Sequence, residues 1–328
     1  MTGGDAMAEK ERAGDRVPPH ERLSLRDLAR VQQLLAPGHR LCAGCGAPIA
    51  VRQIMAGLTT PAVVGCATGC LEVATTIYPY TSWRCSFIHS AFENVAATMS
   101  GVEAAYRALR RRGRVDREMT FIAFAGDGGT YDIGLQALSG MFERRQRVVF
   151  ICYDNGAYMN TGIQRSGATP RGADTTTSPV GARSAGKREP KKDLLAIAVA
   201  HGVPYAAQAA PSHWRDLVRK ARKAFEAPGP AFLSVLAPCP RGWRYDTAAT
   251  IGLTRLAVET CFWPLVEVEG GRWRVTYRPP SPRPLTDFLR PQGRFRHLFE
   301  PHNEALLKEL QEGIDQRWNE LLSRCSED

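Results

Sequence analysis

The segment Gly126-Asp127-Gly128-Gly129-Thr130 stands between an apolar run and a stretch of helical periodicity. Glycines at such a turn let the backbone approach a diphosphate closely, and a following helix presents free N–H groups and its positive dipole end. An aspartate inside the turn faces a phosphate only where a cation lies between them. Asp127 therefore indicates Mg²⁺ bridging to a diphosphate, and a glycine-rich turn without a ligand is the alternative.

A second polar pair ends the next apolar run, RVVFICY. The pair is Asp154 and Asn155, and Asn155 lies 28 positions after Asp127. Consecutive strands of a parallel sheet end at the same edge, where ligands bind. Asp127 and Asn155 can then supply two oxygens to one octahedral ion, and a backbone carbonyl just beyond them can supply a third. The alternative is a pair of strand-end caps that hold no ligand.

Cysteines from three parts of the chain could form a metal centre. Cys42 and Cys45 form a CxxC in a glycine-containing loop, Cys66 and Cys70 follow it with CxxxC spacing, and Cys239 lies far away between two prolines. Four thiolates from separate segments suit Zn²⁺ or an iron–sulfur cluster, and a lone CxxC also suits a redox disulfide. The spacing favours a cluster modestly over zinc, because a zinc ribbon needs a second CxxC. We interpret four other cysteines as structural: Cys85, Cys152, Cys261 and Cys325.

The rest of the sequence predicts a scaffold that can position these residues. Apolar runs of strand length alternate with segments of helical period, which is typical of a doubly wound α/β domain with a mostly parallel sheet. The expected strands are 62–67, 119–125, 147–153, 205–208 and 231–236, and the expected helices are 48–58, 92–112, 133–145, 194–201 and 214–226.

Three parts of the chain are expected. Residues 1–35 form an N-terminal arm and a short helix, 36–260 form the α/β domain, and 261–328 form an extension in which a proline-rich strap leads to a final helix near 303–323. The stretch 156–190 is too long for an ordinary connection, so we expect it to be functional or disordered.

Composition narrows the class of protein. The chain has 328 residues, of which 44% are hydrophobic, so a sizeable core is possible. We expect neither a membrane span nor a secretory signal, because long apolar runs are missing from the sequence. Nine cysteines without such a signal indicate a reducing compartment, here the cytoplasm. The net charge is +10, and many of the basic residues are clustered in the sequence. Such clusters are typical of solvated helix faces or of a surface that binds an anionic partner. Their lack of aromatic neighbours argues against nucleic acid.

Longer stretches resemble one family. GDG, a helix and a strand that ends in asparagine form the fingerprint of a thiamine diphosphate and Mg²⁺ site. Over about residues 36–300 the sequence closely resembles the beta subunits of four-subunit pyruvate:ferredoxin oxidoreductases, within the 2-oxoacid:ferredoxin oxidoreductase family. The matching stretches are APGHRLCAGCG, ATGCLEVATTIYPYTSW, HSAFENVAATMSGVEAA, GDGGTYDIGLQALSGM, YDNGAYMNTGIQRS, CPRGW and QGRFRHLF.

The resemblance implies ligands for three cofactors. It assigns the 4Fe-4S cluster to Cys42, Cys45, Cys70 and Cys239 and leaves Cys66 as a non-ligand. It assigns Mg²⁺ to Asp127, Asn155 and the carbonyl of Ala157. It places around thiamine diphosphate the residues Cys70, Gly126, Asp127, Gly128, Gly129, Asn155, Ala157, Tyr158 and Asn160. Asn160 reaches the reacting carbon in this assignment.

The resemblance also implies an activity and partners. The activity is coenzyme A-dependent oxidative decarboxylation of pyruvate to acetyl-CoA and CO₂, or the reverse, with ferredoxin as electron partner. The partners are an alpha subunit with the pyrimidine domain and the activating glutamate, a gamma subunit and a ferredoxin-like delta subunit. One departure is Gly156, where related chains commonly carry glutamate.

Three alternatives remain open at this point. One is the same chemistry on 2-oxoisovalerate, 2-oxoglutarate or oxalate. A second is a non-oxidative 2-oxoacid decarboxylase or synthase, although such enzymes have much longer chains. The third, from another class, is a basic zinc-stabilised nucleic-acid-binding protein.

Overall fold

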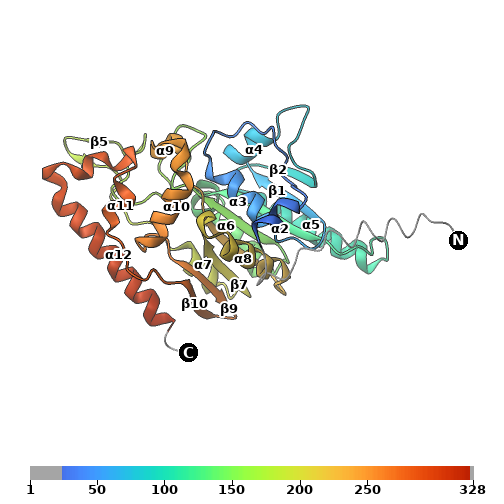
Figure 1. Cartoon of the computed structure of the whole chain (residues 1–328). Helices are drawn as coiled ribbons and strands as arrows, with labels where there is room; N and C mark the ends of the chain where they lie inside the picture. Colours follow the sequence, from blue (N-terminus) through green and yellow to red (C-terminus); the bar gives the residue numbers. More distant parts are fainter. Residues whose placement is uncertain (1–23, 326–328) are drawn as a thin grey trace.

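A central eight-stranded sheet organises the molecule (Figure 1). The computed structural model describes residues 24–325, so the expected arm before Ser24 lies outside the described residues. The strand order is β10-β9-β7-β8-β4-β3-β1-β2. Parallel pairing joins β1 (Ala62–Ala67), β2 (Ser86–Ser90), β3 (Thr120–Gly126), β4 (Val149–Asp154), β7 (Tyr205–Ala209) and β8 (Ala231–Leu236). The predicted doubly wound, mostly parallel sheet is confirmed.

Helices cover both faces of this sheet. One face packs against α3 (Gly46–Met55) and α8 (Trp214–Glu226), and the other packs against α5 (Val95–Arg111), α6 (Leu135–Glu143) and α7 (Leu194–Ala200). The continuous apolar run of β3 serves both layers, since Ile122 and Phe124 enter one core while Phe121 and Ala123 enter the other. Burial on both faces explains why this strand shows no alternation of polar residues.

The C-terminal part closes the sheet on one side. An antiparallel hairpin, β9 (Leu265–Glu269) and β10 (Arg272–Tyr277), adds to β7. A strap with the short α11 (Leu285–Leu289) then leads to α12 (Glu304–Arg324), which runs along the side of the molecule away from β1 and β2 in Figure 1. The expected strap and final helix are confirmed, and the hairpin places part of the 261–328 segment within the central sheet.

The remaining elements are short. They are α2 (Leu25–Arg30), α4 (Cys70–Thr75), α9 (Pro240–Trp243), α10 (Thr250–Glu259), the two-stranded sheet β5 (Val180–Gly181) and β6 (Ser184–Ala185), a π-helical turn at Gly128–Asp132, and 3-10 turns at Pro211–His213, Thr247–Ala249, Gly293–Phe299 and Pro301–Asn303. Ser24 caps α2 through a capping box with Asp27. None of the described helices has the length and apolar character needed to cross a membrane.

The stretch 156–190 folds back onto the chain. Ser166, Ala168, Thr169 and Ala173 are all buried within it. We expect a loop of this length to be either functional or disordered. In the structure it is ordered and its interior is packed. Two of its polar side chains reach the strand ends, since Ser166 bonds to Asp127 and Thr169 bonds to the carbonyl of Gly156.

Candidate functional site

The structure brings Asp127 and Asn155 together at the carboxyl edge of the sheet. Asp127 follows β3 and Asn155 follows β4, and these strands pair in register with Gly126 opposite Tyr153. The backbone N–H of Asn155 donates to Asp127 Oδ1 at 3.2 Å, and both side chains are buried. The spacing of the two residues in the sequence therefore predicts their proximity correctly.

The side-chain amide of Asn155 completes a group of three oxygens. One terminal atom of this amide lies 2.8 Å from the carbonyl oxygen of Ala157 and 2.9 Å from Asp127 Oδ1. With its nitrogen turned inward, the amide donates to both oxygens; with its oxygen turned inward, three oxygens converge. Converging carboxylate, amide and carbonyl oxygens are the ligand set that Mg²⁺ prefers. The donor set thus fits the expected ion.

Ser166 holds the other oxygen of Asp127. Its hydroxyl donates a short hydrogen bond to Asp127 Oδ2, which leaves Oδ1 turned toward Asn155. Burial, with the nearby charge of Asp154, raises the pKa of Asp127 to about 7. A cation at Oδ1 would offset that burial. Ser166 could not be predicted from the sequence, because it lies 39 positions after Asp127, in a loop whose fold no local pattern indicates.

Asp154 fixes the backbone that carries Asn155 and Ala157. Its Oδ1 accepts from the N–H of Gly156 at 3.1 Å, and its Oδ2 accepts from the hydroxyl of Tyr131 at 2.8 Å and from Lys191 Nζ at 2.5 Å. Both carboxylate oxygens of Asp154 are therefore hydrogen-bonded to other groups of the protein, and they position the loop that follows β4. The oxygens that could hold a metal ion belong to Asp127, Asn155 and Ala157.

One small hollow collects the predicted cofactor contacts. Its lining includes every residue assigned to thiamine diphosphate by resemblance: Cys70, Gly126, Asp127, Gly128, Gly129, Asn155, Ala157, Tyr158 and Asn160. A side chain at Gly128 would overlap the ring of Tyr158, whose hydroxyl donates to the Gly128 carbonyl at 2.9 Å. The hollow has a volume of only about 20 Å³, so these residues form one wall of a site.

The four cysteines assigned to the cluster lie beside this wall. Cys45 is the N-cap of α3, Cys70 is the first residue of α4, and Cys239 is the N-cap of α9, where its sulfur accepts from the N–H of Gly242 at 3.3 Å. Cys42 lies at the other end of the short turn that leads into Cys45. Helix N-termini stabilise thiolates through the free N–H groups and the dipole.

The electrostatics show that these thiols are mutual neighbours. Burial raises the pKa of Cys45 and of Cys70 to about 12, and in each case Cys42 and Cys239 add to the rise. In residues 24–325, no three His, Cys, Asp or Glu side chains are arranged to hold a single metal ion. Four neighbouring thiols can hold either Zn²⁺ or an iron–sulfur cluster.

The glutamates and the remaining cysteine near these motifs lie outside the hollow. Cys66 is wholly buried in β1 within the hydrophobic core. Glu72 accepts from the Thr76 hydroxyl at 2.5 Å and pairs with His89 at 3.6 Å. Neither Glu72 nor Glu93 lines the hollow. The described residues therefore present no glutamate to a cofactor there.

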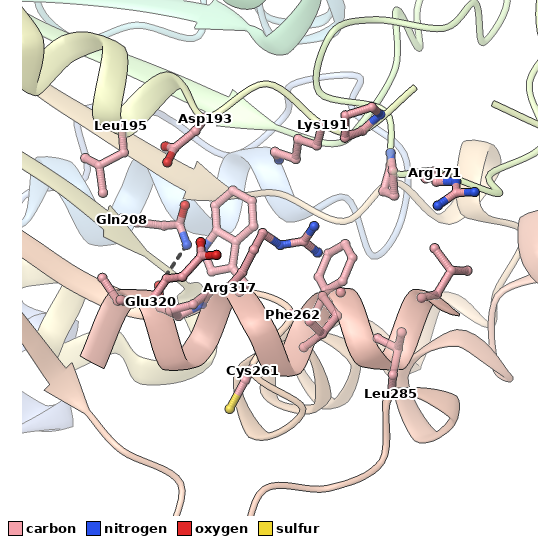
Figure 2. Close-up of a pocket in the computed structure, with 18 of the residues that line it drawn as sticks. Arg171, Lys191, Asp193, Leu195, Gln208, Cys261, Phe262, Leu285, Arg317 and Glu320 are labelled. Carbon is pink, nitrogen blue, oxygen red and sulfur yellow. Dashed lines mark hydrogen bonds between the residues drawn. The ribbon is translucent and has the colours of Figure 1, made fainter. Parts of the chain in front are cut away.

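A larger cavity of about 340 Å³ lies elsewhere, beneath α12. Figure 2 shows Arg317 pointing into it from α12, toward Phe262 and Lys191. Its walls come from the hairpin, the strap and the end of the long loop. Size alone would make it the favoured site, but it contains neither the glycine turn nor the cysteines. Lys191 links the two places through its ion pair with Asp154.

Comparison with known proteins identifies the family. Residues 64–235 match the model for the thiamine pyrophosphate enzyme, C-terminal TPP binding domain. Pyruvate synthase subunit PorB of Thermotoga maritima is 54% identical over 88% of this chain and 91% of its own length. PorB of Methanothermobacter thermautotrophicus is 53% identical over 88% of this chain and 98% of its own. Ketoisovalerate oxidoreductase subunit VorB of Pyrococcus abyssi is 42% identical over 83% of this chain and 88% of its own.

A solved structure agrees with these relatives in fold. The 2-oxoglutarate:ferredoxin oxidoreductase from Magnetococcus marinus superposes with a TM-score of 0.53 at 21% identity, covering 72% of this chain and 81% of that one. A thiamine-binding domain at the position of the glycine turn removes the nucleic-acid-binding alternative. The chain therefore belongs to the thiamine pyrophosphate enzymes and, within them, to the PorB-type beta subunits of the 2-oxoacid:ferredoxin oxidoreductases.

Proposed function

We propose that this chain is the beta subunit of a pyruvate:ferredoxin oxidoreductase that converts pyruvate and coenzyme A to acetyl-CoA and CO₂, or runs the reverse reaction. The observation that carries the proposal is the meeting of the Asp127 carboxylate, the Asn155 side-chain amide and the Ala157 carbonyl at one wall that also includes Cys70. The activity is the one named for the PorB relatives.

Asp127, Asn155 and the Ala157 carbonyl would hold Mg²⁺ against the diphosphate. Thiamine diphosphate would supply the carbon nucleophile and would stabilise the electron pair that remains on the substrate carbon when CO₂ leaves. The chain's share is to bind and orient it. The N–H groups after Gly126 would bind the diphosphate, and Ser166, which donates to Asp127 Oδ2, would keep Oδ1 turned to the ion. Asn160, exposed on the rim, is the side chain that we place next to the reacting carbon.

Cys42, Cys45, Cys70 and Cys239 would hold a 4Fe-4S cluster. Burial, and to a smaller extent neighbouring thiolate charge, raises the pKa of Cys45, Cys70 and Cys239, so metal binding at these thiols would release protons. Cys70 lines the cofactor wall as well, which gives electrons a short path from one group to the other. We propose that ferredoxin receives those electrons through a ferredoxin-like delta subunit.

An alpha subunit would complete the active site. A hollow of about 20 Å³ cannot enclose thiamine, and no glutamate of the described residues lines it. We therefore place the activating glutamate and the pyrimidine-binding domain on an alpha chain, with a gamma chain in the same complex. We also propose that the outer face of the 261–328 segment packs on these partners. All nine cysteines are free, which agrees with the cytoplasm as the place of assembly.

The substrate is the least constrained part of the proposal. Pyruvate is favoured because PorB relatives reach 54% identity, and 2-oxoisovalerate is the second candidate because VorB is 42% identical. The test is the purified complex with its partner chains, assayed with a panel of 2-oxo acids, coenzyme A and methyl viologen. Pyruvate should give the highest kcat/KM. A higher value for 2-oxoisovalerate would replace pyruvate, and activity with neither would reject both.

A further inference from the structure

Arg294 is a buried cation that lies beside both candidate cofactor sites. Its side chain is only 2% exposed, and its one hydrogen bond to a described residue runs from Nε to Gln292 Oε1 at 2.9 Å. None of the ion pairs found between described residues includes it. A buried charge without a paired opposite charge is unfavourable, so the protein retains it against a free-energy penalty.

The guanidinium faces the helix that begins at Cys239. It stacks on the ring of Trp243, the last residue of α9, with 4.0 Å between its central carbon and the ring centroid. Burial lowers the pKa of Arg294 to about 9, while the nearby Asp154 and Cys239 oppose that shift. The side chain therefore stays protonated at neutral pH.

Gly156 leaves room for this charge on the cofactor side. A Cβ atom at Gly156 would lie 3.1 Å from Arg294 Nη1, and the φ of Gly156 is +74°. The guanidinium thus lies between the loop of Asn155 and the helix of Cys239. A carboxylate at position 156 would be placed to pair with it.

We propose that Arg294 is a positioning residue that stabilises the reduced state of the iron–sulfur cluster, and that Gly156 keeps its charge unpaired for that purpose. The inference rests on the proposed function, since it needs the cluster at Cys239. Reduction adds one electron to the cluster and moves no proton, so the negative charge beside Arg294 increases by one. A fixed cation nearby favours that change and raises the reduction potential.

The experiment is a redox titration of the assembled complex followed by electron paramagnetic resonance. The signal of this cluster is identified by its loss in Cys70→Ser. Arg294→Gln removes the charge and Arg294→Lys keeps it. Gly156→Glu adds a carboxylate beside the guanidinium, and Gly156→Gln is its matched control, with the same size and backbone strain but no charge. Iron content is measured in every variant.

We expect Arg294→Gln and Gly156→Glu each to lower the ratio of reduced to oxidised cluster at a fixed potential by about tenfold, equivalent to about 59 mV for one electron. Arg294→Lys and Gly156→Gln should stay close to the wild type. Equal shifts in both Gly156 variants, or an unshifted Arg294→Gln that retains its iron, would overturn the inference. If Arg294→Gln loses iron, the Gly156 pair decides. If Cys70→Ser changes no signal, the proposed cluster itself fails, which is a separate result.

Discussion

The indole N–H of Trp243 donates a 2.6 Å hydrogen bond to the main-chain carbonyl of Asn155, across 88 positions of the chain. Trp243 ends the helix that Cys239 begins, and the side-chain amide of Asn155 lies against Asp127 Oδ1 and the Ala157 carbonyl. The two candidate cofactor sites are therefore joined by one buried bond. A change at either end should be measurable at the other.

Trp243→Phe removes this donor and keeps an aromatic ring. The buried carbonyl of Asn155 then lacks its partner, an effect on the order of 1–3 kcal/mol. We expect the affinity of the complex for thiamine diphosphate with Mg²⁺ to fall about tenfold in titration calorimetry, with iron content unchanged. Trp263→Phe is the control, because its indole donates to Ala209 at 2.8 Å, away from the site. Equal losses in both variants would contradict a specific role of Trp243.

Substitution of single cysteines tests the cluster ligands. Cys70→Ser and Cys239→Ser should lose most of the bound iron and all 2-oxoacid oxidation, because each removes one of four neighbouring thiols. Cys66→Ser should keep both, since Cys66 is enclosed in the core of β1. Iron analysis and visible absorbance of the three variants are the measurements. A colourless Cys66→Ser protein would show that the ligand assignment is wrong.

Asp127→Ala tests the metal site. This variant removes the only carboxylate among the three converging groups, so thiamine diphosphate affinity in the presence of Mg²⁺ should fall severely. Ser166→Ala leaves the carboxylate but frees its second oxygen, and a loss of roughly 10–100-fold is expected, as for other residues that orient metal ligands. Asp287→Ala, at a surface ion pair with Arg283, serves as the control for titration calorimetry. Unchanged affinity in Asp127→Ala would refute the site.

Glu267 gives a pH-dependent prediction for stability. Burial alone would raise its pKa, but hydrogen bonds from Arg274 and Tyr205 and the charge of Lys223 lower it to about 2. A carboxyl whose pKa is depressed in the folded state stabilises the fold above its unfolded pKa, and this contribution is lost as the pH falls toward 2. Glu267→Gln should therefore reduce the free energy of unfolding by about 3 kcal/mol at pH 7 and by less than half of that at pH 3.

Urea unfolding of wild-type and variant chains at the two pH values measures this difference. Glu269→Gln is the matched control, because Glu269 also pairs with Lys223 but its side chain is 62% exposed. Exposed pairs contribute less than about 1 kcal/mol, so this variant should differ little from the wild type at either pH. A Glu267→Gln effect that does not shrink at low pH would mean that packing, and not charge, is what the glutamate contributes.

The isolated chain should be inactive. Thiamine needs a glutamate against its aminopyrimidine, and Glu72 and Glu93 both lie off the wall. The assay uses the cluster-reconstituted chain with pyruvate, thiamine diphosphate, Mg²⁺, coenzyme A and methyl viologen, beside the full complex. Turnover at a rate comparable with the complex would refute the shared active site.

The sequence predicts the position of a residue well when that position follows from the strand or helix that carries it. The apolar runs of β3, β4 and β8 predict buried strands because the sheet is covered on both faces, and the residues at their ends follow directly. The sequence does not predict β2, whose residues are largely half-buried or exposed at the sheet edge, or β10, whose charged residues alternate along RWRVTY. Edge strands lack the two-sided apolar signal, so they resemble loops in a sequence.

The residues that orient the site could not be predicted in the same way. Ser166, Trp243 and Arg294 act on the metal loop and the cysteine helix from distant parts of the chain. Short stretches containing Trp243 and Arg294, CPRGW and QGRFRHLF, match relatives, but a match does not show what a side chain touches. The start of α3 also differs: the helix begins at Gly46, so Pro48 is its third residue and not its first.

The long loop is fastened to both sides of the glycine turn. Ser166 binds Asp127 and the N–H of Gly167 donates to Asp132 at 2.8 Å, while Lys192, just beyond the loop, donates to the carbonyl of Tyr131 at 2.7 Å. Freeing Asp127 from its support therefore means detaching a packed segment, an event on the timescale of local unfolding. A diphosphate held through Mg²⁺ at Asp127 would therefore rest on a carboxylate whose support opens only rarely.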